Sequence, residues 1–140
     1  MGAMTYFSGH RLYLDANIFV YALEAISGWA ERAKEVFQAI DSGTCSAVTS
    51  ELTLSECLVK PLALGRADIV REYLNAIQTR RFLTVVPVGR EILIEAARLR
   101  AVSGIKLPDA IHAATALANG CTRFITNDQR LRAVVGMESI

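Results

Sequence analysis

The sequence has few of the features that mark membrane, secreted or zinc-binding proteins. No uninterrupted apolar run reaches the roughly 18 residues that a membrane-spanning helix needs, and no signal-peptide pattern opens the chain. Only three cysteines are present, and Cys45, Cys57 and Cys121 are widely spaced with no CxxC pair. They predict buried thiols rather than a disulfide framework or a zinc site. We expect a cytoplasmic protein that does not bind a membrane.

An excess of one charge sign is missing as well. The net charge of +1 argues against a broadly basic surface, although arginine supplies 12 of the 15 basic residues. Guanidinium groups bind phosphate in a bidentate manner, but an arginine-rich balance can equally reflect genome composition. Repeats, low-complexity segments and linkers are absent too, which predicts a single domain over residues 5–140. Residues 1–4 (MGAM) look like a remnant of an expression vector.

Apolar residues are plentiful, at 52% of the chain, and their spacing alternates between strand and helix patterns. Strands are predicted at 12–14, 44–49, 82–88 and 123–126, with an edge strand at 137–140 and a turn or short helix at 127–131. Helices are predicted from residue 17 and at 30–40, 50–64, 66–77, 91–102 and 107–119, with Pro61 kinking or ending the third. This alternation predicts an α/β fold with a parallel sheet and right-handed crossovers.

The segment RLYLDANIFVYAL, residues 11–23, predicts a buried strand, a turn and a helix. Asp15 follows the strand directly, and Asn17 is suited to cap the helix. In a parallel α/β sheet the carboxyl ends of the strands and the amino ends of the following helices share one edge. Asp15 is therefore predicted to lie at the edge where such folds bind ligands.

Three further acids are predicted to reach the same edge. Glu56 lies early in the helix after the second strand, Asp109 in the first turn of the last long helix, and Asp128 just after the strand at 123–126. Carboxylates a few ångströms apart repel one another unless a cation lies between them. An all-oxygen ligand set favours Mg²⁺ or Mn²⁺, which can activate water for phosphodiester hydrolysis.

Each of these residues also has a purely structural explanation. Asp15 can cap a strand end, Asp109 can interact with its helix dipole, and Asp128 in the sequence Thr-Asn-Asp is a common turn former. Glu56 competes with Glu51, since either can be a solvated helix charge. The prediction of a metal site depends on their joint placement, because four acids that are far apart in the sequence are expected at one edge of the sheet.

His112 lies one helical turn after Asp109, where a general base is conceivable. Because it stands on an alanine-lined helix face, the sequence favours a partly buried, hydrogen-bonded histidine over a catalytic one.

Three segments follow one another along the chain: LDANIFVYAL, TSELTLSECLVKPL and KLPDAIHAATALANGCTRFITNDQRL. Together they resemble the PIN-domain ribonucleases, especially the VapC-like toxins of prokaryotic toxin–antitoxin systems. The resemblance implies a three-layer α/β/α sandwich with a mostly parallel, about five-stranded sheet. It also implies Mg²⁺- or Mn²⁺-dependent endonucleolytic cleavage of RNA by metal-activated water, a homodimer, and a small cognate antitoxin as partner.

The same resemblance implies roles for individual residues. Asp15, Glu56, Asp109 and Asp128 form the catalytic metal site, and Asn17 and Thr126 are supporting polar contacts to the substrate. The family's second acid corresponds to the glutamate of SECLVKP, which selects Glu56 over Glu51.

Other functions stay open at this point. A PIN-like nuclease can process RNA without being a toxin. A receiver-type signalling module also has an acidic Mg²⁺ pocket, but it needs adjacent acids after its first strand and a late lysine, and no lysine follows Lys106. A phosphatase with Asp15 as nucleophile requires a second aspartate where Asn17 stands. A binding-only domain with a structural ion is the fourth alternative.

Overall fold

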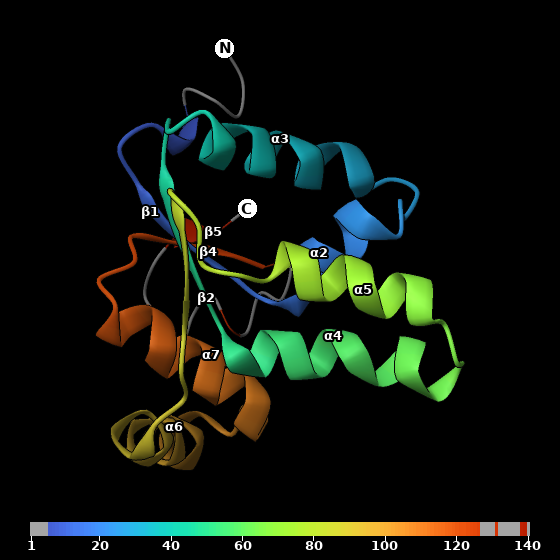
Figure 1. Cartoon of the computed structure of the whole chain (residues 1–140). Helices are drawn as coiled ribbons and strands as arrows, with labels where there is room; N and C mark the ends of the chain where they lie inside the picture. Colours follow the sequence, from blue (N-terminus) through green and yellow to red (C-terminus); the bar gives the residue numbers. More distant parts are fainter. Residues whose placement is uncertain (1–5, 127–130, 132–137, 140) are drawn as a thin grey trace.

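The computed structural model describes residues 6–126, residue 131 and residues 138–139. Its strands are β1 (Arg11–Leu14), β2 (Ser46–Ser50), β3 (Leu83–Val86), β4 (Arg123–Ile125) and β5 (Glu138–Ser139). They form one five-stranded sheet in the order β3-β2-β1-β4-β5, and all of its strand pairs are parallel (Figure 1). The predicted parallel sheet of about five strands is confirmed, and so is the edge strand near the end of the chain.

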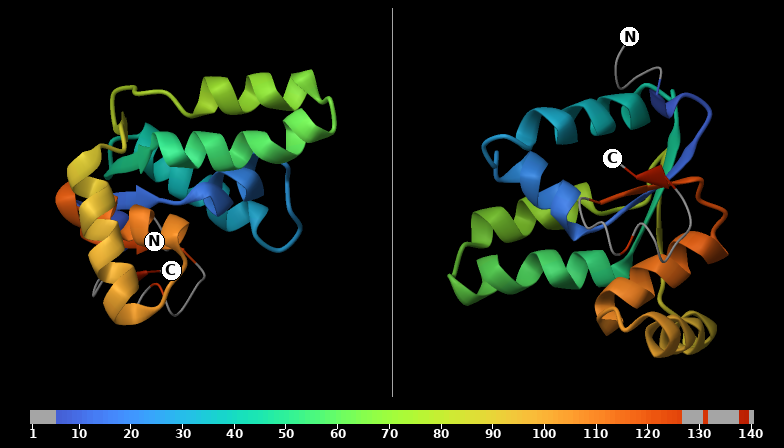
Figure 2. Two further views of the ribbon diagram at one scale, coloured as in Figure 1. Left: turned by 90° about the horizontal axis from the view of Figure 1, so that it is seen from below. Right: turned by 180° about the vertical axis from the view of Figure 1, so that it is seen from behind.

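Helices cover both faces of this sheet (Figures 1 and 2). The helices are α2 (Ala16–Leu23), α3 (Ala30–Asp41), α4 (Glu51–Ala63), α5 (Ala67–Ala76), α6 (Arg90–Ser103) and α7 (Leu107–Ala118). One core cluster joins the sheet to α2, α3, α4 and α5, and a second joins it to α6 and α7. The predicted three-layer α/β/α architecture is confirmed. None of the helices in the described part of the chain is long and apolar enough to cross a membrane.

The central strand β1 shows why both faces are covered. Leu12 and Leu14 belong to the first core cluster and Tyr13 to the second, because successive side chains of a strand point to opposite faces. Tyr13 pairs in register with Val48 of β2 and Phe124 of β4, and all three are fully buried. A strand that is buried on both faces needs the continuous apolar run seen in the sequence.

Two local predictions need correction, and one near Pro61 holds. Asn17 does not cap the first helix: the N-cap is Asp15, whose extended backbone (φ −84°, ψ 179°) lets its carboxylate accept the Asn17 N–H at 3.1 Å. Pro61 lies in the last turn of α4, which ends at Ala63, within one residue of the predicted end at 64. Strand β3 stops at Val86, just before Pro87, which has no N–H to donate to a ladder.

The turn from α3 into β2 depends on Gly43, and we expect Gly43→Ala to destabilise the fold by about 1–2 kcal/mol. The backbone of Gly43 is left-handed (φ +79°), and an added Cβ would meet Phe82 Cζ at 2.9 Å. Chemical denaturation would measure the loss. Gly104→Ala is the matched control, since Gly104 has a similar φ (+75°) with open space around a Cβ. A loss at Gly43 no larger than at Gly104 would contradict the role given to the Phe82 contact.

Candidate active site

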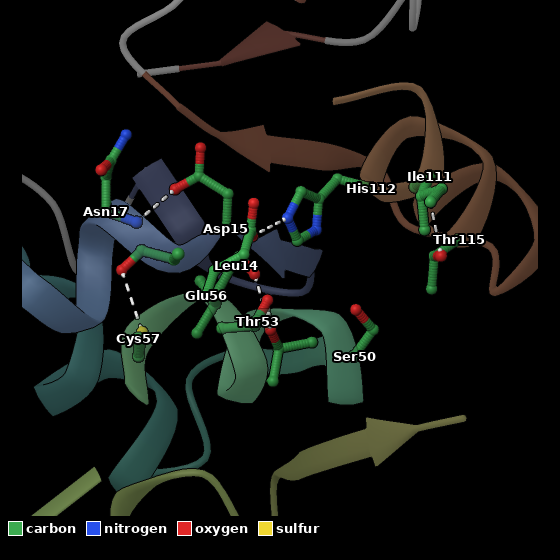
Figure 3. A network of polar contacts seen from close by, with 12 residues as sticks. Leu14, Asp15, Asn17, Ser50, Thr53, Glu56, Cys57, Ile111, His112 and Thr115 are labelled. Carbon is green, nitrogen blue, oxygen red and sulfur yellow. Dashed lines mark hydrogen bonds and ion pairs between the residues drawn. The ribbon is translucent and has the colours of Figure 1, made fainter. Parts of the chain in front are cut away.

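Several strands end, and several helices begin, at the carboxyl edge of the sheet. Strand β1 ends at Leu14 and Asp15 follows at once, and α4 begins directly after β2. Helix α7 leads into β4, which is parallel to β1, so the amino end of α7 lies toward the same edge. Figure 3 shows Asp15 between Asn17 and His112 at this edge, with Glu56 of α4 nearby.

Asp15 is the buried acid of this edge, with only 8% of its surface exposed. Burial raises its pKa from 3.8 to about 6. The His112 charge lowers the pKa in part, as do hydrogen bonds from the Thr126 side chain and from the Asn17 and Ile18 backbone. Within the described residues, no lysine or arginine forms an ion pair with Asp15. A carboxylate in this position favours either a proton or a cation beside it.

Glu56 is held by a buried histidine. Glu56 Oε1 lies 2.6 Å from His112 Nε2, and the Glu56 side chain is 33% exposed while that of His112 is 3% exposed (Figure 3). On the other side of the ring, His112 Nδ1 lies 2.7 Å from the Tyr13 hydroxyl, which is 3.1 Å from Ser50 Oγ. A polar chain therefore runs from β2 through β1 and α7 to the carboxylate on α4.

The protons in this chain follow from the chemistry of its members. Burial raises the pKa of Tyr13, so the phenol keeps its single proton. An ionised Glu56 only accepts hydrogen bonds, so His112 Nε2 must carry hydrogen. The phenol has one proton to donate: it goes to Ser50 Oγ when a charged ring donates from Nδ1 to the phenol oxygen, or to Nδ1 when the ring is neutral, with Ser50 then donating to the phenol. In both states each ring nitrogen is engaged, which leaves His112 no lone pair for a metal ion.

The other predicted site residues have different positions. Asp109 is half-buried in the first turn of α7, three residues before His112 and so on the same side of that helix. Thr126 is 5% exposed and hydrogen-bonds the Asp15 side chain. Asn17 is exposed in the first turn of α2 and donates its backbone N–H to Asp15. Asp128 lies outside the described residues.

The donor set at this edge fits a hard divalent cation. Its members offer carboxylate and hydroxyl oxygens, whereas the three cysteines are buried and free. Within residues 6–126, 131 and 138–139, no group of three or more histidine, cysteine or acidic side chains is arranged to hold a metal ion. The structure thus joins Asp15 to Thr126 and Glu56 to His112, and the predicted fourfold acidic cluster stays a prediction.

Sequence reasoning missed the polar chain behind Glu56. It did predict a hydrogen-bonded His112, which is confirmed, although the residue is more deeply buried than predicted, at 2% exposure. It did not predict Glu56 as the ring's partner, nor Tyr13 and Ser50 behind it. The available signal was a tyrosine inside a fully buried strand, since a buried phenol needs a hydrogen-bond partner.

A parallel sheet with acidic side chains at its carboxyl edge is typical of enzymes that act on phosphate esters with a divalent metal. The family model of the PIN domain matches residues 12–136, and the chain belongs to this family. Membership makes the chain a nuclease domain, and it favours the nuclease over the receiver-type and phosphatase alternatives. None of the curated protein sequences matches the chain.

Solved structures with a similar fold include VapBC2 from Rickettsia felis, bound to a promoter DNA fragment, with a TM-score of 0.72 and 15% identity over 93% of this chain and 97% of that one. VapC20 from Mycobacterium tuberculosis is a toxin that cleaves the sarcin–ricin loop. It has a TM-score of 0.72 and 16% identity, over 87% of this chain and 93% of VapC20. A toxin–antitoxin complex from Klebsiella pneumoniae contains a chain with a TM-score of 0.63 and 23% identity, over 87% of this chain and 90% of that one. At these identities the likeness shows the shared fold.

Proposed function

We propose that this protein is an endoribonuclease that depends on Mg²⁺ or Mn²⁺ and hydrolyses RNA phosphodiester bonds with metal-activated water. The metal ligands are Asp15, Glu56, Asp109 and Asp128. The observation that carries the proposal is the buried Asp15 carboxylate at the carboxyl edge, for which the described chain supplies no lysine or arginine partner. A divalent ion would both neutralise this charge and supply an activated water and a contact for a phosphate oxygen.

The protein's own residues prepare the edge for that ion. The Asn17 N–H and the Thr126 hydroxyl fix the orientation of the Asp15 carboxylate. His112 fixes the carboxylate of Glu56 on the neighbouring helix. The exposed side chain of Asn17 would donate to the RNA backbone, and Thr126, directly after β4, would support the substrate. Preorganised groups of this kind lower the barrier because they need not reorganise during the reaction.

The cellular role that we propose is the toxin of a type II toxin–antitoxin pair, acting in the cytoplasm as a homodimer that a small cognate antitoxin inhibits. Support comes from the relatives in fold, among which are VapC20, VapBC2 and the Klebsiella pneumoniae toxin–antitoxin complex. Co-purification of a small protein, encoded by the adjacent gene, would support this role. Normal growth on induction without such a partner would favour an RNA-processing nuclease instead.

The activity is tested by removing and restoring the metal. Purified protein treated with EDTA is expected to leave total RNA intact, because the acidic edge alone cannot activate water. Added Mg²⁺ or Mn²⁺ should restore cleavage, and sequencing of the new 5′ ends should show defined internal sites. Cleavage that persists in EDTA would contradict metal dependence. Phosphate transfer from a small donor to Asp15, without RNA cleavage, would contradict the nuclease function.

A further inference from the structure

We propose that His112 is a positioning residue that holds the Glu56 carboxylate ready for the metal ion; this inference rests on the proposed function. His112 itself neither binds the ion nor touches RNA. It acts through one hydrogen bond, from its Nε2 to Glu56 Oε1 at 2.6 Å. Tyr13 and Ser50 act behind it, because they fix the ring that makes this bond.

The first argument is the contrast in exposure between the two partners. The His112 side chain is 3% exposed, whereas the Glu56 side chain is 33% exposed at the rim of the edge. A rim carboxylate is well solvated without any protein partner, and a glutamate loses considerable rotamer freedom when it is fixed. The contact with His112 removes that freedom before a ligand arrives. Preorganisation of this kind strengthens the binding of whatever the carboxylate holds next.

The second argument is the anchoring of the ring. Its Nδ1 meets the hydroxyl of Tyr13, whose own ring packs on Phe124 with centroids 5.1 Å apart and whose hydroxyl meets Ser50. Both Tyr13 and Phe124 are fully buried in neighbouring strands. The ring is thus anchored to two fully buried, paired strands, and a fixed outer partner orients the ligand that it contacts.

The third argument is the sequence position of His112 on α7. Asp109 precedes it by one helical turn, in the first turn of α7. The bond between His112 of α7 and Glu56 of α4 therefore links the helix that carries Asp109 to the helix that carries Glu56. Loss of this bond is expected to loosen two proposed ligands together.

The test is a titration of the metal-free protein with Mn²⁺ alone, in which the EPR signal of free Mn²⁺ reports how much of the ion stays unbound. His112→Ala is expected to weaken Mn²⁺ binding by about 10- to 100-fold, as loss of an outer partner commonly does. His112→Gln should recover most of the affinity, because its amide N–H₂ stands near the position of Nε2 and can donate to Glu56. His112→Asn should not, since its shorter amide reaches only toward Tyr13. Equal affinities of the Gln and Asn variants would overturn the proposal.

Two controls separate positioning from general damage to α7. Thr115→Val removes a fully buried hydroxyl from the same helix, one that donates to the Ile111 carbonyl, and should leave Mn²⁺ affinity unchanged. In a Glu56→Ala background, His112→Ala should cause no further loss of affinity, because the bond through which it acts is already gone. Additive losses in this double-mutant cycle would overturn the proposal.

The outcomes also distinguish this inference from the proposed function. If Asp15→Asn loses Mn²⁺ binding while His112→Ala retains it, the positioning role is wrong and the nuclease assignment stands. If the wild-type protein binds no Mn²⁺, or Asp15→Asn binds Mn²⁺ and cleaves RNA as the wild type does, the proposed function itself is wrong.

Discussion

Asp15→Asn is expected to lower RNA cleavage by about two to four orders of magnitude, the usual cost of neutralising a central catalytic acid. The amide has nearly the same size as the carboxylate and caps a helix equally well, so the N-cap bond to Asn17 is kept. What it loses is the negative charge that would attract a divalent ion. The measurement is the single-turnover cleavage rate of a defined RNA at saturating Mn²⁺.

The matched control is Asp41→Asn, which makes the same chemical change at the end of α3. The Asp41 side chain is 65% exposed and lies 3.9 Å from Arg80 Nε. Because α3 ends where the chain enters β2, Asp41 lies at the opposite edge of the sheet from Asp15. Its loss should leave cleavage within about 2-fold, as expected for a surface substitution away from the site. Equal rates in the two variants would remove Asp15 from the catalytic centre.

The sequence predicted the sheet well because its strands are buried on both faces. Residues 12–14 read as a continuous apolar run, and such runs are characteristic of parallel sheets. Helix ends were predicted to within about one residue, including the end of α4 just past Pro61. Strand ends were predicted less well: the strand predicted at 82–88 forms over Leu83–Val86, because Pro87 has no N–H to donate to a ladder.

The candidate site was predictable only at the level of topology. Parallel strands and crossover helices place Asp15, Glu56 and Asp109 toward one edge whatever their side-chain contacts are. The partner of a side chain depends on rotamers and distances that no spacing encodes. The bond between Glu56 and His112 joins residues 56 positions apart, and the one between Tyr13 and His112 spans 99 positions. The helical spacing placed His112 on a buried face, but it could not identify these partners.

The burial of Asp15 favours the binding of a cation, and it also destabilises the fold while no cation is bound. A carboxylate fully exposed to water would bind a divalent ion weakly, since water competes for the ion and screens the charge. At 8% exposure Asp15 is largely shielded from this competition, and its charge is correspondingly unfavourable while no cation is present. Activity and stability are therefore expected to respond in opposite directions to loss of this charge.

Asp15→Asn is accordingly expected to stabilise the metal-free protein at pH 7.5, by at most about 3 kcal/mol, the free energy that corresponds to a pKa raised from 3.8 to about 6. Below pH 3.8 the carboxyl is protonated in both the folded and the unfolded chain, so it contributes no pH dependence. Between pH 4 and 6 the folded chain binds more protons, and wild-type stability should fall as the pH rises. The difference between the variant and the wild type should therefore grow over this window and then level off.

Urea denaturation in EDTA, at intervals between pH 4 and 8, would measure this difference. Asp68→Asn is the informative control, because the hydrogen bond from Arg66 lowers the pKa of the exposed Asp68 to about 2. The stability that Asp68 contributes is present above pH 3.8 and is lost as the pH falls, so its pH dependence has the opposite sign. Added Mg²⁺ should stabilise the wild type and leave Asp15→Asn nearly unchanged, because only the wild type keeps the charge that the ion neutralises. A wild type that is the more stable of the two at pH 7.5 in EDTA would show that burial does not penalise the Asp15 charge.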